Sequence, residues 1–189
     1  MKILPSSFFD RPTVKVAQDL IGCVLACKHG RYTERLTITE TEAYDGFDDK
    51  ASHASRGKTA RNEIMFRSAG HIYVYFTYGM HWMLNIVTGP RDYPAAVLIR
   101  GGIDRDTDSN ANKPVNGPAR LTKYLGITGK LNGKKLGRVS GLWIEARTPA
   151  MTAILNDPRA IKRMPRIGVD YAGPVWAKKK WRFIFCADS

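Results

Sequence analysis

The sequence feature that most constrains the fold is residues 36–44, Leu-Thr-Ile-Thr-Glu-Thr-Glu-Ala-Tyr, which have the composition of a β-strand. Side chains alternate between the two faces of a strand, so Leu36, Ile38, Glu40 and Glu42 are expected to share one face. The aliphatic pair marks that face as the core side, where a carboxylate is costly unless it is paired or used chemically. A carboxylate at the mouth of a core suits a water-activating general base. The alternative is a strand that runs out into solvent and exposes both carboxylates.

The chain has 189 residues, of which 43% are hydrophobic, so we expect a single domain over residues 1–189 with a sizeable core. Strand-like segments dominate, with helical spacing near residues 12–21 and 116–126. The expected fold class is α/β, of the α+β kind, with a curved antiparallel β-sheet surrounded by helices. Residues 45–64 predict a polar functional loop, and residues 103–114 predict a mobile surface loop.

Several classes of protein are disfavoured by the sequence. No apolar run approaches the roughly 20 residues that span a bilayer, and the N-terminus lacks the apolar stretch of a signal peptide. The three cysteines are too scattered for a disulfide framework or a zinc finger, which favours free thiols in a reducing compartment. We find no metal-ligand spacing and no phosphate-binding glycine motif, so we expect no metal and no cofactor.

The positive charge is concentrated in the C-terminal part of the chain. Residues 113–189 hold 16 Lys and Arg against 4 Asp and Glu, whereas residues 1–112 hold 14 against 13. Such an asymmetry indicates a polyanionic partner, for which basic side chains provide sequence-independent phosphate contacts.

Aromatic residues crowd the segment from residue 73 to residue 82. Alternation places Tyr73, Tyr75 and Thr77 on one side of a strand that leads to a turn at Gly79. Single aromatic residues in strands usually fill cores, but a cluster also suits the stacking of nucleic-acid bases. His53 in the polar loop and Arg100 at the end of an apolar strand are further candidates, although both residue types are common on surfaces.

Taken together, these segments closely resemble the alkyladenine DNA glycosylase family, also called 3-methyladenine or methylpurine DNA glycosylases. The resemblance rests on Glu40-Thr-Glu-Ala-Tyr44, His53, Tyr73-Val-Tyr-Phe-Thr-Tyr-Gly-Met80 with Asn85, Val97-Leu-Ile-Arg100 and Asn116-Gly-Pro118. It covers nearly the whole chain from about residue 8. Differences within residues 74–84 from the animal members concern substrate range.

The resemblance implies a role for each matching residue. Glu42 would activate the attacking water, with Arg100 and the main-chain carbonyl of Ile167 helping to hold it. Tyr44 and His53 would sandwich the extruded base, beside Tyr75. The remaining implied roles are a main-chain N–H to the base edge from Ala51, exclusion of normal purines by Asn85, and insertion into the duplex by Tyr78.

The resemblance also implies a reaction and a partner. We expect a monofunctional DNA glycosylase that removes 3-methyladenine, 7-methylguanine, hypoxanthine or ethenoadenine from double-stranded DNA with water as the nucleophile. Flipping would carry the damaged purine into a pocket. Arg138, Arg163 and Lys178 are our candidates for contacts with the DNA backbone. We further expect a monomer without membrane association, in the cytoplasm of a bacterium and associated with its nucleoid.

Two rival interpretations remain at the level of sequence. A basic, β-rich domain with exposed aromatic residues could be a non-catalytic RNA- or DNA-binding module. A bifunctional glycosylase with lyase activity would use a Lys or the N-terminal amine as its nucleophile. Glu42 argues against the pure binder, because such a protein gains nothing from a core-facing acid.

Overall fold

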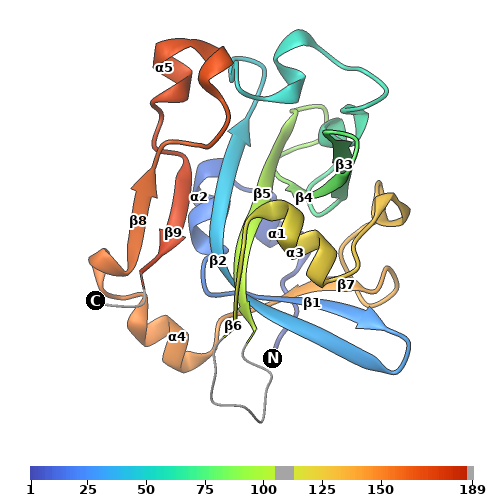
Figure 1. Cartoon of the computed structure of the whole chain (residues 1–189), viewed down its shortest axis with the longest axis vertical. Coiled ribbons are helices and arrows are strands. Elements are labelled where there is room, and N and C mark those ends of the chain that lie inside the picture. The colour runs from blue at the N-terminus through green and yellow to red at the C-terminus, as the bar shows by residue number, and fades with distance from the viewer. Residues whose placement is uncertain (105–112, 187–189) are drawn as a thin grey trace.

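The structure is a computed structural model that describes residues 1–104 and 113–186 (Figure 1). The strands are β1 (Val24–His29), β2 (Tyr32–Asp45), β3 (Ile72–Thr77), β4 (His81–Val87), β5 (Ala95–Asp104), β6 (Lys113–Asn116), β7 (Leu142–Glu145), β8 (Ile161–Met164) and β9 (Arg182–Phe185). The α-helices are α1 (Ser6–Phe9), α2 (Thr13–Asp19), α3 (Pro118–Tyr124), α4 (Pro149–Ile154) and α5 (Gly173–Ala177). Short 3₁₀ turns are η1 (His53–Arg56), η2 (Glu63–Phe66), η3 (Gly129–Leu131), η4 (Pro158–Ala160) and η5 (Asp170–Ala172).

The strands form one antiparallel sheet whose central path is β3-β4-β5-β2-β1-β7. β6 adds to β5, and the β8–β9 pair joins through β9 to β2. The sheet curls into a half-barrel, and the segment around Lys135 and Gly137 bridges β3 to β7 through His71 and Leu142. The predicted fold class, a curved antiparallel sheet with helices around it, is confirmed.

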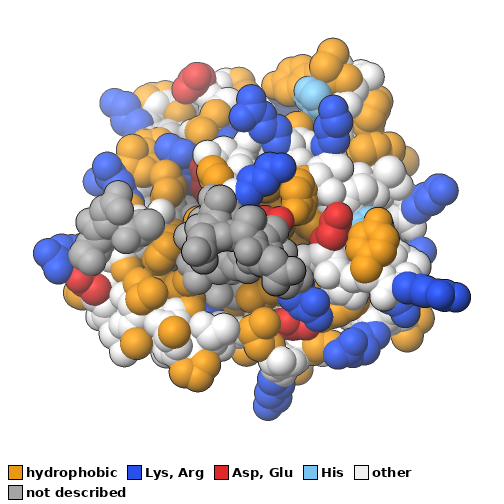
Figure 2. Space-filling view, turned by 60° about the horizontal axis from the view of Figure 1, so that its bottom comes forward, with side chains coloured by type: hydrophobic (Ala, Val, Ile, Leu, Met, Phe, Trp, Pro, Cys, Tyr) orange, Lys and Arg blue, Asp and Glu red, His pale blue; other side chains and the backbone are white. Residues whose placement is uncertain are grey.

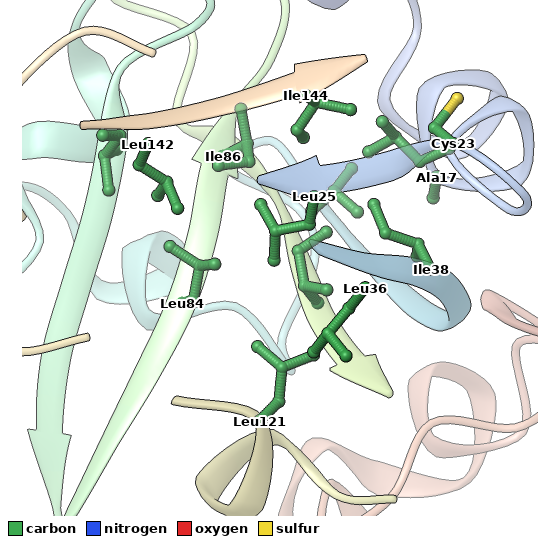
Figure 3. Packing of buried hydrophobic residues seen from close by; sticks show 14 of the residues in the cluster. Ala17, Cys23, Leu25, Leu36, Ile38, Leu84, Ile86, Leu121, Leu142 and Ile144 are labelled. Carbon is green, nitrogen blue, oxygen red and sulfur yellow. The ribbon is translucent and has the colours of Figure 1, made fainter. Parts of the chain in front are cut away.

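The core lies inside the curl of the sheet and joins residues that are distant in the sequence. Leu25, Leu36 and Ile38 pack with Leu84 and Leu121, all buried, and Figure 3 shows these side chains converging from several strands and helix α3. Helix α2 packs against the same core and is tied to β2 by a hydrogen bond of 2.8 Å from the Thr41 hydroxyl to the Ala17 carbonyl.

The long strand β2 contains an irregularity that changes which residues face the core. Ile38 pairs with Gly102 and Glu40 pairs with Gly101, so Thr39 is an extra residue on β2. A β-bulge of this kind reverses the alternation of the residues that follow it. Ala43 joins the core cluster of Leu36 and Ile38, whereas Glu40 and Glu42 point to the opposite face. The prediction that both carboxylates share the face of Leu36 and Ile38 is therefore wrong.

Other differences from the expected elements are local. Helix α2 begins after Pro12 without a side-chain cap and ends at Asp19, two residues before the end of the helical spacing expected near residues 12–21. Helices α4 and α5 and strand β8 had no clear sequence signal. Of the span 103–114, expected to be a mobile loop, the two ends belong to β5 and β6, and residues 105–112 lie outside the described residues.

A buried ion pair joins the polar loop after β2 to the segment before η5. Asp49 and Arg166 are fully buried and form a two-point contact, with 2.8 Å between Arg166 Nη2 and Asp49 Oδ1. Arg166 also donates a hydrogen bond of 2.8 Å to the carbonyl of Ala43, and its guanidinium lies 4.9 Å from the ring centre of Tyr44. The pair therefore fixes two loops against the end of β2.

We predict that Asp49→Ala lowers the free energy of unfolding by about 3–5 kcal/mol, because it leaves the buried Arg166 charge uncompensated. Urea denaturation of wild type and variant measures the difference. Arg159→Ala is the matched control, since it removes a surface ion pair with Asp157 and should leave the denaturation midpoint unchanged. A loss below about 1 kcal/mol for Asp49→Ala would contradict a bracing role for the pair.

Candidate active site

Glu42 lies in a row of side chains that crosses five strands of the sheet. Cross-strand pairing sets Glu42 opposite Leu98, Leu98 opposite Asn85, and Asn85 opposite Tyr73. On its other edge, Glu42 pairs with Arg182 of β9. Directly opposed residues in a sheet point to the same face. The face turned away from the main core therefore carries a carboxylate, an amide and an aromatic ring in line.

The Glu42 carboxylate is fully buried yet has a polar partner at each oxygen. Oε1 accepts a hydrogen bond of 2.8 Å from the main-chain N–H of Ile167. Oε2 accepts one of 2.8 Å from the Tyr44 hydroxyl and lies 3.3 Å from Nη1 of Arg100. Groups from three parts of the chain thus hold the carboxylate in one orientation.

Burial raises the pKa of Glu42 above the usual range of a glutamate. Arg100, the Ile167 N–H and the Tyr44 hydroxyl favour the ionised form and oppose this rise, while the neighbouring charge of Glu40 adds to it. A carboxylate with a raised pKa holds a proton more strongly than an exposed one. Glu42 is therefore better suited than an exposed glutamate to accept a proton.

Arg100 is shared between two carboxylates. Its Nε lies 3.2 Å from Glu40 Oε1, and its Nη1 reaches Glu42. Glu40 also pairs with Arg182 at 2.9 Å. Glu40 is thus a structural partner of both arginines, and among the described interactions it acts on Glu42 through Arg100 and through its charge.

A cavity of about 340 Å³ opens above Glu42. Three of the residues that contact the carboxylate, Tyr44, Arg100 and Ile167, line the cavity. Every residue predicted for catalysis, base binding or insertion lines this cavity, except Glu42, which lies beneath it. The predicted residues in the lining are Tyr44, Ala51, His53, Tyr75, Tyr78, Asn85, Arg100 and Ile167.

Aromatic rings form one wall of the cavity. The rings of His53 and Tyr75 lie 4.6 Å apart in an edge-to-face arrangement, and Tyr73 packs 5.3 Å from Tyr75. Nδ1 of His53 is 3.2 Å from the Tyr73 hydroxyl. Burial and the nearby charge of Arg61 lower the pKa of His53, and burial raises the pKa of Tyr75 to about 12. The wall is therefore uncharged near neutral pH, and its rings can receive a planar ligand.

Two polar groups predicted to contact a base already have partners in the protein. The N–H of Ala51 donates to Asp49 Oδ1 at 3.1 Å. The side-chain amide of Asn85 donates to the carbonyls of Tyr73 and Met83, at 3.2 and 3.4 Å. The oxygen of this amide remains as an acceptor beside the cavity, so Asn85 can discriminate among ligands by the donors they present.

Tyr78 lies at the tip of the β3–β4 hairpin, where the turn at Gly79 was expected. Both residues have positive φ, 51° and 66°, and the Met80 N–H bonds the Thr77 carbonyl at 3.2 Å, as in a type I′ turn. Tyr78 is 84% exposed although a side chain is disfavoured in that backbone region. The hairpin therefore projects an aromatic ring beside the cavity mouth.

The three residues predicted to contact a DNA backbone lie away from the cavity lining. Arg138 stacks over Trp143 at 5.1 Å, and Arg163 bonds the Gln18 side chain at 2.6 Å. Lys178 follows α5 and is exposed. Figure 2 shows Lys and Arg side chains spread around one face of the molecule, with several acidic side chains among them.

Several residues of the site had no role assigned from the sequence. Asp49 and Arg166 brace the loops that carry Ala51 and Ile167, and Tyr171 borders the cavity. Arg182 could be found only through the pairing of β9 with β2. An isolated arginine or tyrosine near the C-terminus carries no signal of its own without the fold.

Within residues 1–104 and 113–186, we find no cluster of His, Cys, Asp and Glu that could hold a metal ion. The same part of the chain contains no helix that is long and apolar enough to cross a membrane.

Comparison with known proteins places the chain in a family. Residues 7–189 match the family model described as methylpurine-DNA glycosylase. A relative from Methanocella arvoryzae is 43% identical, with 97% of this chain and 92% of the relative covered. Relatives from Psychrobacter cryohalolentis and Myxococcus xanthus are 40% and 41% identical, covering 95% and 96% of this chain and 89% of each relative. All three are named provisionally as 3-methyladenine DNA glycosylases. The chain therefore belongs to the methylpurine-DNA glycosylase family.

Proposed function

We propose that this protein is a monofunctional DNA glycosylase, which flips alkylated or deaminated purines out of duplex DNA and hydrolyses the N-glycosidic bond with a water activated by Glu42. The substrates are 3-methyladenine, 7-methylguanine, hypoxanthine and ethenoadenine. The product is an abasic site, with which base excision repair begins. The protein acts as a monomer in the cytoplasm, associated with the nucleoid.

The observation that carries this proposal is the fully buried carboxylate beneath an aromatic cavity. A binding module has no use for a charge that is expensive to desolvate. An enzyme that breaks a glycosidic bond needs a carboxylate opposite the leaving base, because the sugar develops positive charge as the bond breaks.

The chemical step requires one water and no covalent enzyme intermediate. As the bond from C1′ to the base nitrogen breaks, its electron pair leaves with the base. The water oxygen bonds to C1′, and Glu42 takes the water proton. Arg100 and the main-chain carbonyl of Ile167 hold this water. A cationic base such as 3-methyladenine leaves readily, whereas neutral hypoxanthine needs help at its ring.

The cavity supplies the binding part of the mechanism. Tyr44 and His53 sandwich the extruded base, with Tyr75 beside them, and cation–π attraction favours a positively charged base. The N–H of Ala51 turns from its partner in the loop to the base edge, and Asn85 excludes normal purines. Tyr78 fills the gap that the base leaves in the duplex.

Basic side chains of the C-terminal part hold the phosphate backbone. Arg138, Arg163 and Lys178 are the proposed contacts, and they provide affinity for damaged and undamaged duplex alike.

The overall test is incubation of the protein with a duplex that contains one hypoxanthine, followed by alkali. Strand scission at the lesion supports the glycosylase, whereas gel retardation without scission supports the non-catalytic binder. Borohydride trapping of a covalent adduct would show a bifunctional lyase instead.

We predict that Glu42→Gln binds the lesion but loses base release by roughly 10²–10⁴, because the amide keeps its size and cannot take a proton. Single-turnover excision measures this loss, and gel retardation checks binding. Glu40→Gln is the matched control, since Glu40 acts on Glu42 only through Arg100 and through its charge among the described interactions. A greater loss for Glu40→Gln than for Glu42→Gln would contradict the assignment of Glu42 as the base.

The raised pKa of Glu42 predicts an acid limb in the rate of excision. The ionised carboxylate is the active form, so the rate falls as the pH drops through a pKa above the usual glutamate value. Tyr44→Phe removes a donor to the ionised form and should move this limb to higher pH. Tyr75→Phe, which keeps every described hydrogen bond of Glu42, should not move it. Profiles of single-turnover rate against pH for the three proteins give the comparison.

We predict that Tyr78→Ala impairs excision less when the lesion lies opposite a mismatched base, where less unstacking energy is needed. Because Tyr78 is exposed, the variant should lose under about 1 kcal/mol of stability. Single-turnover rates on matched and mismatched duplexes, with thermal unfolding, provide the measurements. An equal defect on both duplexes, or a large drop in the unfolding midpoint, would rule out the insertion role.

A further inference from the structure

Tyr171 is a second exposed aromatic residue at the cavity mouth, and neither the sequence analysis nor the proposed mechanism uses it. Tyr171 lies four residues after Ile167 and lines the cavity, yet it is 70% exposed. Tyr78 borders the same cavity from the β3–β4 hairpin. A large exposed ring at the entrance to a cavity is a feature of binding surfaces rather than of cores.

The ring of Tyr171 is held in place by its hydroxyl, which donates a hydrogen bond of 2.9 Å to the carbonyl of Ala51. Its neighbour Ala172 is buried in a small cluster with Ala51 and Val169. The main chain and the hydroxyl are therefore both fixed while the ring faces solvent. A fixed aromatic surface loses little conformational entropy when a ligand packs against it.

The position of the glycosidic bond determines what Tyr171 can contact. The base must lie among the rings of the cavity, and C1′ must lie next to Glu42. Since the N–H of Ile167 bonds Glu42, the sugar attached to C1′ has to pass Ile167. Ile167, Gly168, Val169 and Tyr171 line the cavity along one continuous stretch of chain. This stretch therefore connects the expected position of the sugar, beside Ile167, to Tyr171 at the cavity mouth.

We propose that Tyr171 packs its ring against the deoxyribose of the extruded nucleotide and thereby retains the flipped state. This inference rests on the proposed function, because it requires that a nucleotide enters the cavity. Tyr171 is a positioning residue for the substrate: it raises the population of flipped nucleotide and takes no part in proton transfer. Tyr171 changes the flipping equilibrium, and it does not change the rate of bond cleavage in the flipped complex.

A purely structural role for Tyr171 would be to tie the loop of Ala51 to the segment after Ile167. Two variants separate this role from the proposed one. Tyr171→Phe loses the hydrogen bond to Ala51 and keeps the ring, while Tyr171→Ala loses both. Tyr32→Ala is the control, since Tyr32 is 63% exposed in the β1–β2 hairpin and does not line the cavity.

The experiment uses a duplex with a single 1,N6-ethenoadenine, whose fluorescence rises when the base leaves the duplex stack and falls again when the base stacks between the rings of the cavity. Stopped-flow fluorescence gives the flipping equilibrium, and quenched single-turnover samples give base release. Tyr171→Ala should lower the flipping equilibrium constant by roughly five- to twentyfold, as loss of a ring contact to a nucleotide does. The flipping equilibrium constant of Tyr171→Phe should stay within about threefold of the wild-type value, and that of Tyr32→Ala should equal the wild-type value.

Other outcomes overturn the inference. Equal defects in Tyr171→Phe and Tyr171→Ala would assign the effect to the loop tie. An equal loss of affinity for undamaged duplex would make Tyr171 a general DNA contact. If wild type neither flips nor releases the base, the proposed function fails; if wild type does both and Tyr171→Ala flips normally, this inference alone fails.

Discussion

The structure of the site depends on one extra residue in the longest strand. Without the bulge at Thr39, alternation would carry Glu40 and Glu42 into the core beside Leu36, where neither could be ionised without great cost. The bulge lies where β2 exchanges one neighbour for another, with β1 pairing up to Thr37 and β9 pairing from Glu40. A change in pairing thus coincides with a change of face. Strand β2 therefore contributes apolar side chains to the core in its first half and carboxylates to the opposite face in its second half.

Burial and polar contact oppose each other at Glu42, and burial decides the direction of the pKa shift. The opposing contacts still matter, because they hold the carboxylate in place while it carries charge. They depend in turn on residues that do not touch it: Arg166 fixes Tyr44 by stacking and precedes Ile167 in the chain. Asp49 compensates the charge of Arg166. A buried ion pair can therefore determine the geometry of a neighbouring site without touching its carboxylate.

Sequence patterns were reliable where one residue type has one strong preference. The alternation of Tyr73 and Tyr75, and the turn at Gly79, follow from local chemistry and are confirmed. Local chemistry could not reveal the bulge, because Thr39 differs in no way from the threonines on either side of it. It also could not reveal Arg166 or Arg182, whose partners lie more than 100 residues away. The residues that the family resemblance singled out for the base pocket line one cavity, and their roles stay predictions. The paired loops that support them come only from the three-dimensional structure.

The late position of β9 in the chain has a consequence for synthesis. Arg182, on the last described strand, holds Glu40 and pairs beside Glu42, and the Ile167 N–H that orients Glu42 also comes from the C-terminal part. When the first 160 residues have been made, the β3–β4 hairpin and the strand β2 that carries Glu42 are present, but neither of these supports has been supplied. The site therefore forms only after these residues have been made, and a chain that stops before them cannot hold the Glu42 carboxylate in its observed orientation.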